Sequence, residues 1–177
     1  MCVAGITFYA CNDQSASTAS TEPAKDTTKP VAPVIDYPYT ASYSSSFEMG
    51  DPQHAKTILD LWKHFDNNTL DNGVGSFADS VTMQLADGTV MSGPRDSIIA
   101  GAKGYRSQFA AVNSSVDAFV VLKSTDKNAS WVNIWGKEVR TDKKGKKDSS
   151  QLMESWMLND QGKVALMLQY AAKAWPE

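Results

Sequence analysis

The sequence predicts an α+β domain in which helices cover one face of an antiparallel sheet. Two observations carry this prediction. Helical patterns are concentrated between residues 51 and 109, and strand patterns separated by turn residues fill most of the chain after residue 115. Helices followed by a meander of strands are typical of folds whose helices are segregated to one face of the sheet. A change of composition near residue 50 separates this domain from a polar N-terminal segment.

Length, charge and cysteine content exclude several classes of protein. The chain has 177 residues, 42% of them apolar, and a formal net charge of −3. This size fits one domain with a tail, and the absence of a basic excess argues against nucleic acid as a partner. Both cysteines, Cys2 and Cys11, precede residue 12, so the domain has no disulfide framework and no cysteine-based metal site. We expect neither a metal nor a cofactor, since the sequence has no phosphate-binding glycine loop and no nucleophile elbow.

Residues 1–11 resemble a signal peptide that ends in a lipobox-like cysteine. The stretch is apolar and places Ala10 directly before Cys11. Two features depart from the pattern: no Lys or Arg precedes Lys25, and Tyr9 is bulky where a small residue is usual. An upstream start would remove the first departure, and an apolar N-terminus without this role is the alternative. The lipobox interpretation predicts a protein of the cell envelope, anchored through lipid on Cys11 at the periplasmic side or the cell surface.

Residues 12–50 are predicted to form a linker. They are rich in Ser, Thr, Ala and Pro, a composition that cannot bury enough apolar surface to offset the entropy of the chain. Such a segment holds a domain away from a surface. Its last part is too aromatic for a pure linker, which favours packing of that part onto the domain; the aromatic residues are Tyr37, Tyr39, Tyr43 and Phe47.

Three helices are predicted in residues 51–109. Asp51-Pro52 supplies an N-cap carboxylate and a proline at the first helical position. Apolar residues then recur at spacings of three and four, which indicates an amphipathic helix; they are Ala55, Ile58, Leu59, Trp62 and Phe65. A weak second helix follows over residues 70–77, and Gly93-Pro94 begins a third that runs to about Phe109.

Six strands are predicted from apolar patterns and turn chemistry. A short hairpin over 80–85 and 89–91 turns at Ala86-Asp87-Gly88, and longer strands follow at about 115–124, 129–141, 149–159 and 163–172. In the segments Trp131–Trp135 and Leu152–Leu158, both alternating sets of side chains are largely apolar. Helices can cover only one of the two faces. The other face is expected either to form a homodimer through the sheet or to be covered by tight curling of the sheet itself.

Several segments in this order resemble the nuclear transport factor 2-like superfamily, which includes SnoaL-like polyketide cyclases and ketosteroid isomerase. They are Asp51-Pro52 opening a helix that carries Trp62, Phe77-Ala78-Asp79-Ser80-Val81 leading into a strand, Gly93 before a helix, and Trp156-Met157-Leu158-Asn159-Asp160-Gln161-Gly162-Lys163-Val164 near the end of the sheet. The resemblance covers about residues 51–172, and we assign residues 51–177 to one domain of this kind. It implies a cone: a strongly curved antiparallel sheet with about three helices on its concave side around a pocket.

The resemblance also implies positions for a site. Aligning on Phe77-Ala78-Asp79 puts the isomerase's tyrosine at Leu61 and its general base at Leu85, and neither leucine can perform acid–base chemistry. Aligning on Gly162-Lys163-Val164 puts the oxyanion-stabilising acid at Glu154, among apolar neighbours that would raise its pKa. The same alignment puts Met167 and Gln169 on the pocket side of the last strand. A carboxylate paired with a basic residue such as Arg140 is the alternative for Glu154.

These positions predict a binding domain whose apolar pocket takes a small molecule oriented by a lone carboxyl. Together with the lipobox-like segment, they predict that this domain is exported. The expected ligand-binding residues are Glu154, Gln169, Met167, Trp156, Trp62, Met83 and Tyr105. Binding is favoured over catalysis because the general base is missing. One alternative is an isomerase, cyclase or dehydratase that uses Glu154 as its acid. Another is a scaffold domain whose pocket is filled by its own Trp and Met side chains.

Overall fold

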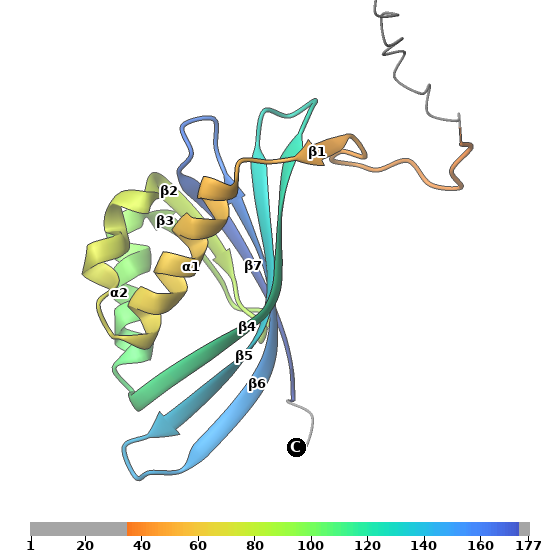
Figure 1. The fold of residues 1–177 in the computed structure, drawn as a ribbon. Helices are drawn as coiled ribbons and strands as arrows, with labels where there is room; N and C mark the ends of the chain where they lie inside the picture. The colour runs from red at the N-terminus through yellow and green to blue at the C-terminus, as the bar shows by residue number, and fades with distance from the viewer. Residues whose placement is uncertain (1–34, 174–177) are drawn as a thin grey trace, which may run out of the picture. The chain divides into compact units, whose positions relative to one another are not determined.

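The structure, a computed structural model, describes residues 35–173, and a compact unit of the chain begins at Thr40 (Figure 1). The chain forms ten elements in the order β1 (Phe47–Met49), α1 (Pro52–Asp66), η1 (Leu70–Ser76), β2 (Phe77–Gln84), β3 (Val90–Pro94), α2 (Arg95–Arg106), β4 (Phe109–Ser124), β5 (Ser130–Asp142), β6 (Lys147–Leu158) and β7 (Val164–Lys173). Strand β1 and residues from Thr40 onward lie within the range predicted as linker. No described helix has the length and apolar character needed to cross a bilayer.

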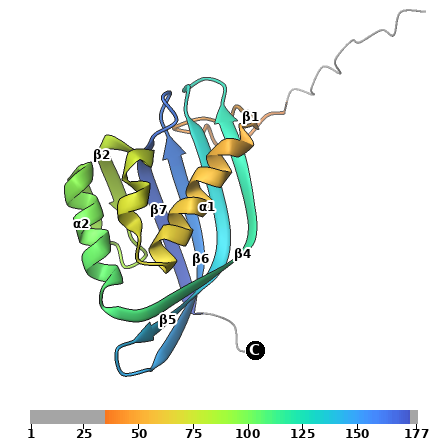
Figure 2. The same cartoon turned by 60° about the vertical axis from the view of Figure 1, so that its left-hand side comes forward.

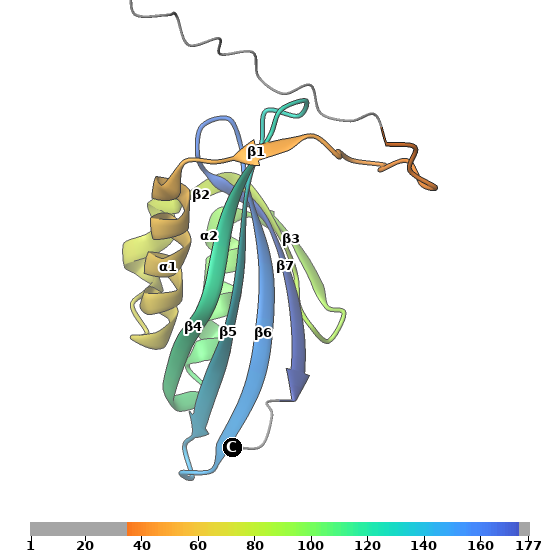
Figure 3. The same cartoon turned by 45° about the vertical axis from the view of Figure 1, so that its right-hand side comes forward.

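The strands form one sheet in the order β1-β4-β5-β6-β7-β2-β3. Helices α1, η1 and α2 all lie on its concave side, and the opposite side faces away from them (Figures 2 and 3). The predicted α+β class with a strongly curved sheet is therefore confirmed, although the sheet stays open. All neighbouring strands are antiparallel except β2 and β7, which are parallel. No hairpin links these two strands, so the turn signals that predicted a meander did not fix their relative direction.

The pairing of β4 with β5 is irregular in the middle of β4. The register shifts between Val116 and Ala118, and such bulges bend a strand. Gly136 of β5 pairs with Val116 at this point. A Cβ atom on Gly136 would collide with the carbonyl oxygen of Ser115 and press against the ring of Trp62. The missing side chain therefore lets Trp62 approach the sheet closely.

Helix α1 follows its sequence signals. The Asp51 side chain accepts a hydrogen bond of 2.8 Å from the backbone N–H of Gln53, and Pro52 occupies the first turn. The buried residues of the helix are Ala55, Ile58, Leu61 and Trp62. Its apolar face packs on the sheet and forms one wall of the core.

Helix α2 ends at Arg106, three residues before the predicted end at Phe109, where β4 already begins. The buried Arg106 guanidinium donates to the carbonyl oxygens of Phe65 at 2.8 Å, Asp66 at 2.8 Å and Phe109 at 3.1 Å. Carbonyl groups at a helix end lack partners within the helix, and Arg106 satisfies those of α1. The same side chain thus fixes both helices and the start of β4.

The convex face of the sheet carries one of the two alternating sets of apolar side chains that the sequence shows in the segments Trp131–Trp135 and Leu152–Leu158. Alternation from the buried residues puts Trp135, Met153 and Tyr170 on this face, and Trp135 and Tyr170 are 36% and 53% exposed. Tyr43 packs edge-on against Trp131 there, with ring centroids 5.6 Å apart. Curling does not cover the exposed residues, so a homodimer through this face stays a prediction.

Candidate functional site

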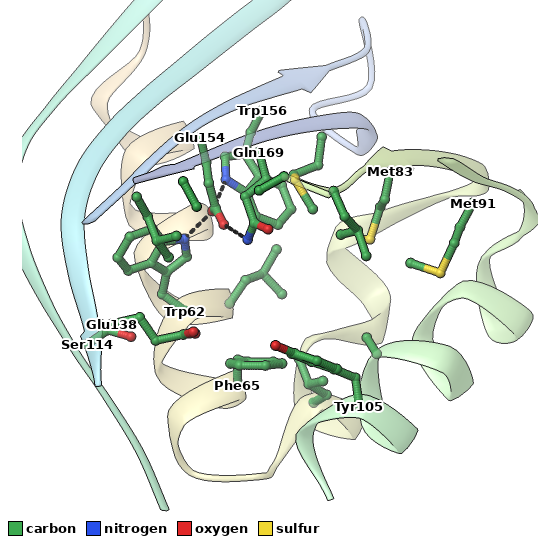
Figure 4. Close-up of a pocket in the computed structure, with 18 of the residues that line it drawn as sticks. Trp62, Phe65, Met83, Met91, Tyr105, Ser114, Glu138, Glu154, Trp156 and Gln169 are labelled. Carbon is green, nitrogen blue, oxygen red and sulfur yellow. Dashed lines mark hydrogen bonds between the residues drawn. The ribbon is translucent and has the colours of Figure 1, made fainter. Parts of the chain in front are cut away.

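A cavity of about 430 Å³ lies between the helices and the concave face of the sheet (Figure 4). Its wall is mostly apolar and is formed by residues such as Leu61, Phe65, Phe77, Met83, Met91, Ile99, Leu152 and Met167. This volume lies in the range of pockets that hold small organic molecules. The Trp and Met side chains line the cavity and leave it open, which argues against the filled scaffold considered from the sequence.

Glu154 is buried at one end of this cavity, 5% exposed, and its carboxylate accepts three hydrogen bonds. The indole N–H groups of Trp62 and Trp156 donate to Oε2 at 2.7 Å and 2.9 Å, and the side-chain amide of Gln169 donates to Oε1 at 2.8 Å. Figure 4 shows these three side chains converging on the carboxylate. The resemblance predicted Glu154 and Gln169 on the pocket side, and both line the cavity.

The fold explains this convergence. Glu154 and Gln169 are cross-strand partners in β6 and β7, and Trp156 lies two residues along β6 on the same face. Trp62 comes from α1, and its ring lies against Gly136. The four side chains therefore join one helix to two strands.

Burial and hydrogen bonding act on Glu154 in opposite directions. Burial raises the pKa of this carboxyl, and the hydrogen bonds from Gln169, Trp62 and Trp156 lower it by a smaller amount. The indole groups can only donate, so Oε2 stays an acceptor in either protonation state. While Glu154 is ionised, its Oε1 holds the amide nitrogen of Gln169 and leaves the amide oxygen of Gln169 available to a ligand in the cavity.

Glu138 is a second buried acid on the cavity wall, so Glu154 is not the lone carboxyl that we predicted. Glu138 is 9% exposed. Burial raises its pKa to about 7, with smaller increases from the charges of Glu154 and Asp66 and decreases from those of Arg140 and Arg106. Once the structure places Val132 and Ile134 in the core, two-residue alternation along β5 puts Glu138 on the same face.

Arg140 pairs with Glu138 and not with Glu154, the partner considered from the sequence. Its Nε lies 3.5 Å from Glu138 Oε1. Its Nη1 donates to the hydroxyl oxygen of Tyr105 at 2.8 Å, and its Nη2 donates to Asp148 at 3.1 Å and to Ser150 at 3.0 Å. Arg140 is thereby held at the cavity wall by three elements of the fold.

The structure brings all the predicted pocket residues of the domain to one cavity. Trp62, Trp156, Met83, Met167 and Gln169 line it, and so do Leu61 and Leu85, the positions that lack the isomerase's catalytic groups. Tyr105 also lines it but is 42% exposed, at the end of α2. Their role in binding stays a prediction, and Cys11 lies outside the described residues.

This chain is similar to known proteins in its structure, at low sequence identity. No family model matches the sequence, and no curated protein matches it. Similar solved structures include an NTF2-like protein of unknown function from Exiguobacterium sp. 255-15 (TM-score 0.54, 13% identity, 67% of this chain and 99% of that one). A putative dehydratase of the NTF2-like family from Streptomyces avermitilis is also similar (TM-score 0.57, 10% identity, 69% and 95% covered), as is AusH from Aspergillus nidulans (TM-score 0.56, 14% identity, 73% and 90% covered). At these identities the likeness concerns the fold.

Proposed function

Because the chain has the fold of NTF2-like proteins, we propose that it is an exported, lipid-anchored domain that binds a small, largely apolar molecule. The observation that carries this proposal is the open cavity of about 430 Å³ with apolar walls and one fixed polar end. Pockets of this kind bind ligands through apolar contact and use a few placed polar groups for orientation.

Gln169 is the group that orients the ligand at this end. Its amide nitrogen is held by Glu154, and its amide oxygen remains to accept a hydrogen bond from the ligand. Glu154 acts as a positioning residue, since its own oxygens already accept three hydrogen bonds. This division of roles refines the expectation that Glu154 itself contacts the ligand.

Ligand extraction followed by mass spectrometry of the purified domain tests the proposal. We expect the same small molecule to be recovered from repeated preparations. Ala102 lines the cavity, so Ala102→Trp should fill it and abolish recovery. The matched control is Gly104→Ala on the same helix, because Gly104 is exposed and a Cβ there meets no atom within 4 Å. Repeated failure to recover a ligand from the wild-type domain, or equal recovery from Ala102→Trp, would contradict the proposal.

Proton-transfer catalysis of the dehydratase or cyclase kind is the second candidate. Glu138 favours it, because a buried carboxyl with a pKa of about 7 can give or take a proton near neutral pH. One similar structure is described as a putative dehydratase. Binding stands first because Leu61 and Leu85 occupy the positions where the isomerase has its tyrosine and base.

Export and anchoring rest on the apolar stretch before Cys11. Replacing Cys11 by Ser removes the thiol that would carry the lipid. We expect the wild-type protein in the membrane fraction and Cys11→Ser in the soluble fraction. An unchanged distribution would contradict the lipid anchor without affecting the proposed pocket.

A further inference from the structure

Glu138, the second buried acid on the cavity wall, has hydrogen-bonding capacity that the described residues do not use. Glu138 receives no hydrogen bond from any of them, and its closest charged partner is Arg140 Nε at 3.5 Å. That Nε is itself buried and has no hydrogen-bond partner among the described residues. Buried polar groups in native proteins are nearly always hydrogen-bonded, so the unused acceptors of Glu138 on the cavity wall point to a donor that the chain does not supply.

The pair is also held in place. The two terminal nitrogens of Arg140 are fixed by Tyr105, Asp148 and Ser150, which leaves Nε as the donor without a partner. Glu138 contributes an acceptor beside it. The hydroxyl oxygen of Tyr105 accepts from Arg140, so the proton of that hydroxyl also remains available. All three side chains line the cavity.

The charges of this pair select the kind of group that fits. A ligand carboxylate would be repelled by ionised Glu138, and a ligand ammonium would be repelled by Arg140. A neutral hydroxyl avoids both repulsions, because its proton is donated to Glu138 and its oxygen can accept the free proton of the Tyr105 hydroxyl. A hydroxyl also loses less hydration energy than an ion on entering an apolar cavity.

The strand register shows that Glu138 and Glu154 are separate positions on the cavity wall. Ile134 of β5 pairs with Glu154, and Glu138 lies four residues further along β5, about 13 Å along the backbone. The side chains converge on the concave face, where the charge of Glu154 raises the pKa of Glu138. One ligand in the cavity can therefore contact both Glu138 and Gln169.

We propose that Glu138, with Tyr105 held beside it by Arg140, forms a second subsite that binds a hydroxyl group of an apolar ligand, whose other polar group donates a hydrogen bond to Gln169. This inference rests on the proposed function, because it specifies the ligand class of the same cavity. It assigns to the pocket an apolar molecule with two hydroxyls, or with a hydroxyl and another neutral donor.

A probe series of equal shape tests the second subsite on the full chain. The probes are the para,para′-diol of biphenyl, its monomethyl ether, which has one donor fewer, and biphenyl itself. Quenching of tryptophan fluorescence measures their affinities, since Trp62 and Trp156 line the cavity. We expect the diol to bind about tenfold more tightly than the monomethyl ether, the effect of one hydrogen bond to a charged group.

Variants assign that difference to the subsite. Glu138→Met should remove the advantage of the diol and weaken the monomethyl ether less than the diol, because the ether can turn its one hydroxyl to Gln169. Glu138→Gln keeps an acceptor and should retain part of the diol's higher affinity. Glu48→Gln, on the exposed strand β1, is the matched control. Equal affinity of the diol and the ether in the wild type would overturn the second subsite while leaving the proposed function intact. The same conclusion follows if Glu138→Met weakens both probes equally. Absence of binding by all three probes would count against the proposed function itself.

Discussion

Glu154 and Glu138 are both buried acids on the concave face of one sheet, but their oxygens are satisfied to very different extents. Glu154 accepts three hydrogen bonds from neutral N–H donors. Glu138 has only a loose ion pair with Arg140, at 3.5 Å. The difference arises from position, because two indole rings reach Glu154, whereas the polar neighbours of Glu138 are already engaged with one another.

This comparison separates two uses of a buried carboxyl. A fully hydrogen-bonded acid fixes the side chains around it and contributes to the stability of the fold. An acid with unused acceptors is destabilising by itself and becomes favourable when a ligand supplies the donor. Glu154 is therefore expected to belong to the framework of the pocket, and Glu138 to its binding surface.

The largest expected effect is the loss of stability on replacing Glu154. Glu154→Met leaves the N–H groups of Trp62 and Trp156 and the amide of Gln169 without their acceptor in a buried site. Each buried unsatisfied donor costs about 1–3 kcal/mol, so we expect the free energy of unfolding to fall by about 4 kcal/mol. Urea denaturation monitored by circular dichroism measures this change.

Glu154→Gln is the control for that substitution. Its amide oxygen can still accept from both indole groups, and the Gln169 amide can turn to meet the new NH2 group. We expect less than half of the loss seen with Met. Equal stability of Glu154→Met and the wild type would show that the hydrogen bonds at Glu154 contribute nothing to the framework.

The next effect is a loss of stability as pH rises. Glu138 ionises near its ordinary value of 4.5 in the unfolded chain and at about 7 in the folded one. Between these values the folded state keeps a proton that the unfolded state has lost, so raising the pH favours unfolding. We expect the titration of Glu138 to lower the free energy of unfolding by about 3 kcal/mol between about pH 4 and pH 8. Glu154, whose pKa is also raised by burial, acts in the same direction.

Unfolding free energies of the wild type and Glu138→Gln across this pH range isolate the contribution. The variant keeps the shape of the side chain but cannot titrate at this position. Its free energy of unfolding should therefore fall by about 3 kcal/mol less than that of the wild type across this pH range. If the free energies of unfolding of the two proteins changed with pH in parallel, the pKa of Glu138 would be the same in the folded and unfolded chains, and burial would not raise it.

The comparison also shows how far the sequence could predict this site. Local signals were sufficient for the first helix, which begins at Asp51-Pro52, and for the turn with a left-handed glycine at Gly88. The resemblance placed Glu154 and Gln169 on the pocket face, and cross-strand pairing confirms that they are neighbours. Fixed two-residue alternation within strands makes such positions predictable once one residue of the strand is placed.

The remaining parts of the site depend on contacts that no local pattern encodes. Trp62 reaches Glu154 across 92 residues of sequence, and its ring fits against β5 because Gly136 has no side chain there. Glu138 was missed because both alternating sets of β5 are apolar near Trp131–Trp135, so polarity could not show which face points inward. Only the position of the helices over one face resolves that choice.

The smallest expected effect is a gain of stability on making Glu138 apolar, opposite in sign to the same change at Glu154. Glu138→Met removes a buried charge that receives no hydrogen bond from the described residues, and its ion pair with Arg140 is too long to offset much of the desolvation. Arg140 keeps Asp148 as an ionic partner, so the substitution leaves no unpaired charge. At about pH 8 we expect the free energy of unfolding to rise by about 1–2 kcal/mol. Because Glu154→Met and Glu138→Met exchange the same residue types within one cavity, a difference in sign cannot arise from the change in volume or in intrinsic strand preference. Losses of similar size in the two variants would instead place both acids in the framework and leave the cavity without a free acceptor for a ligand hydroxyl.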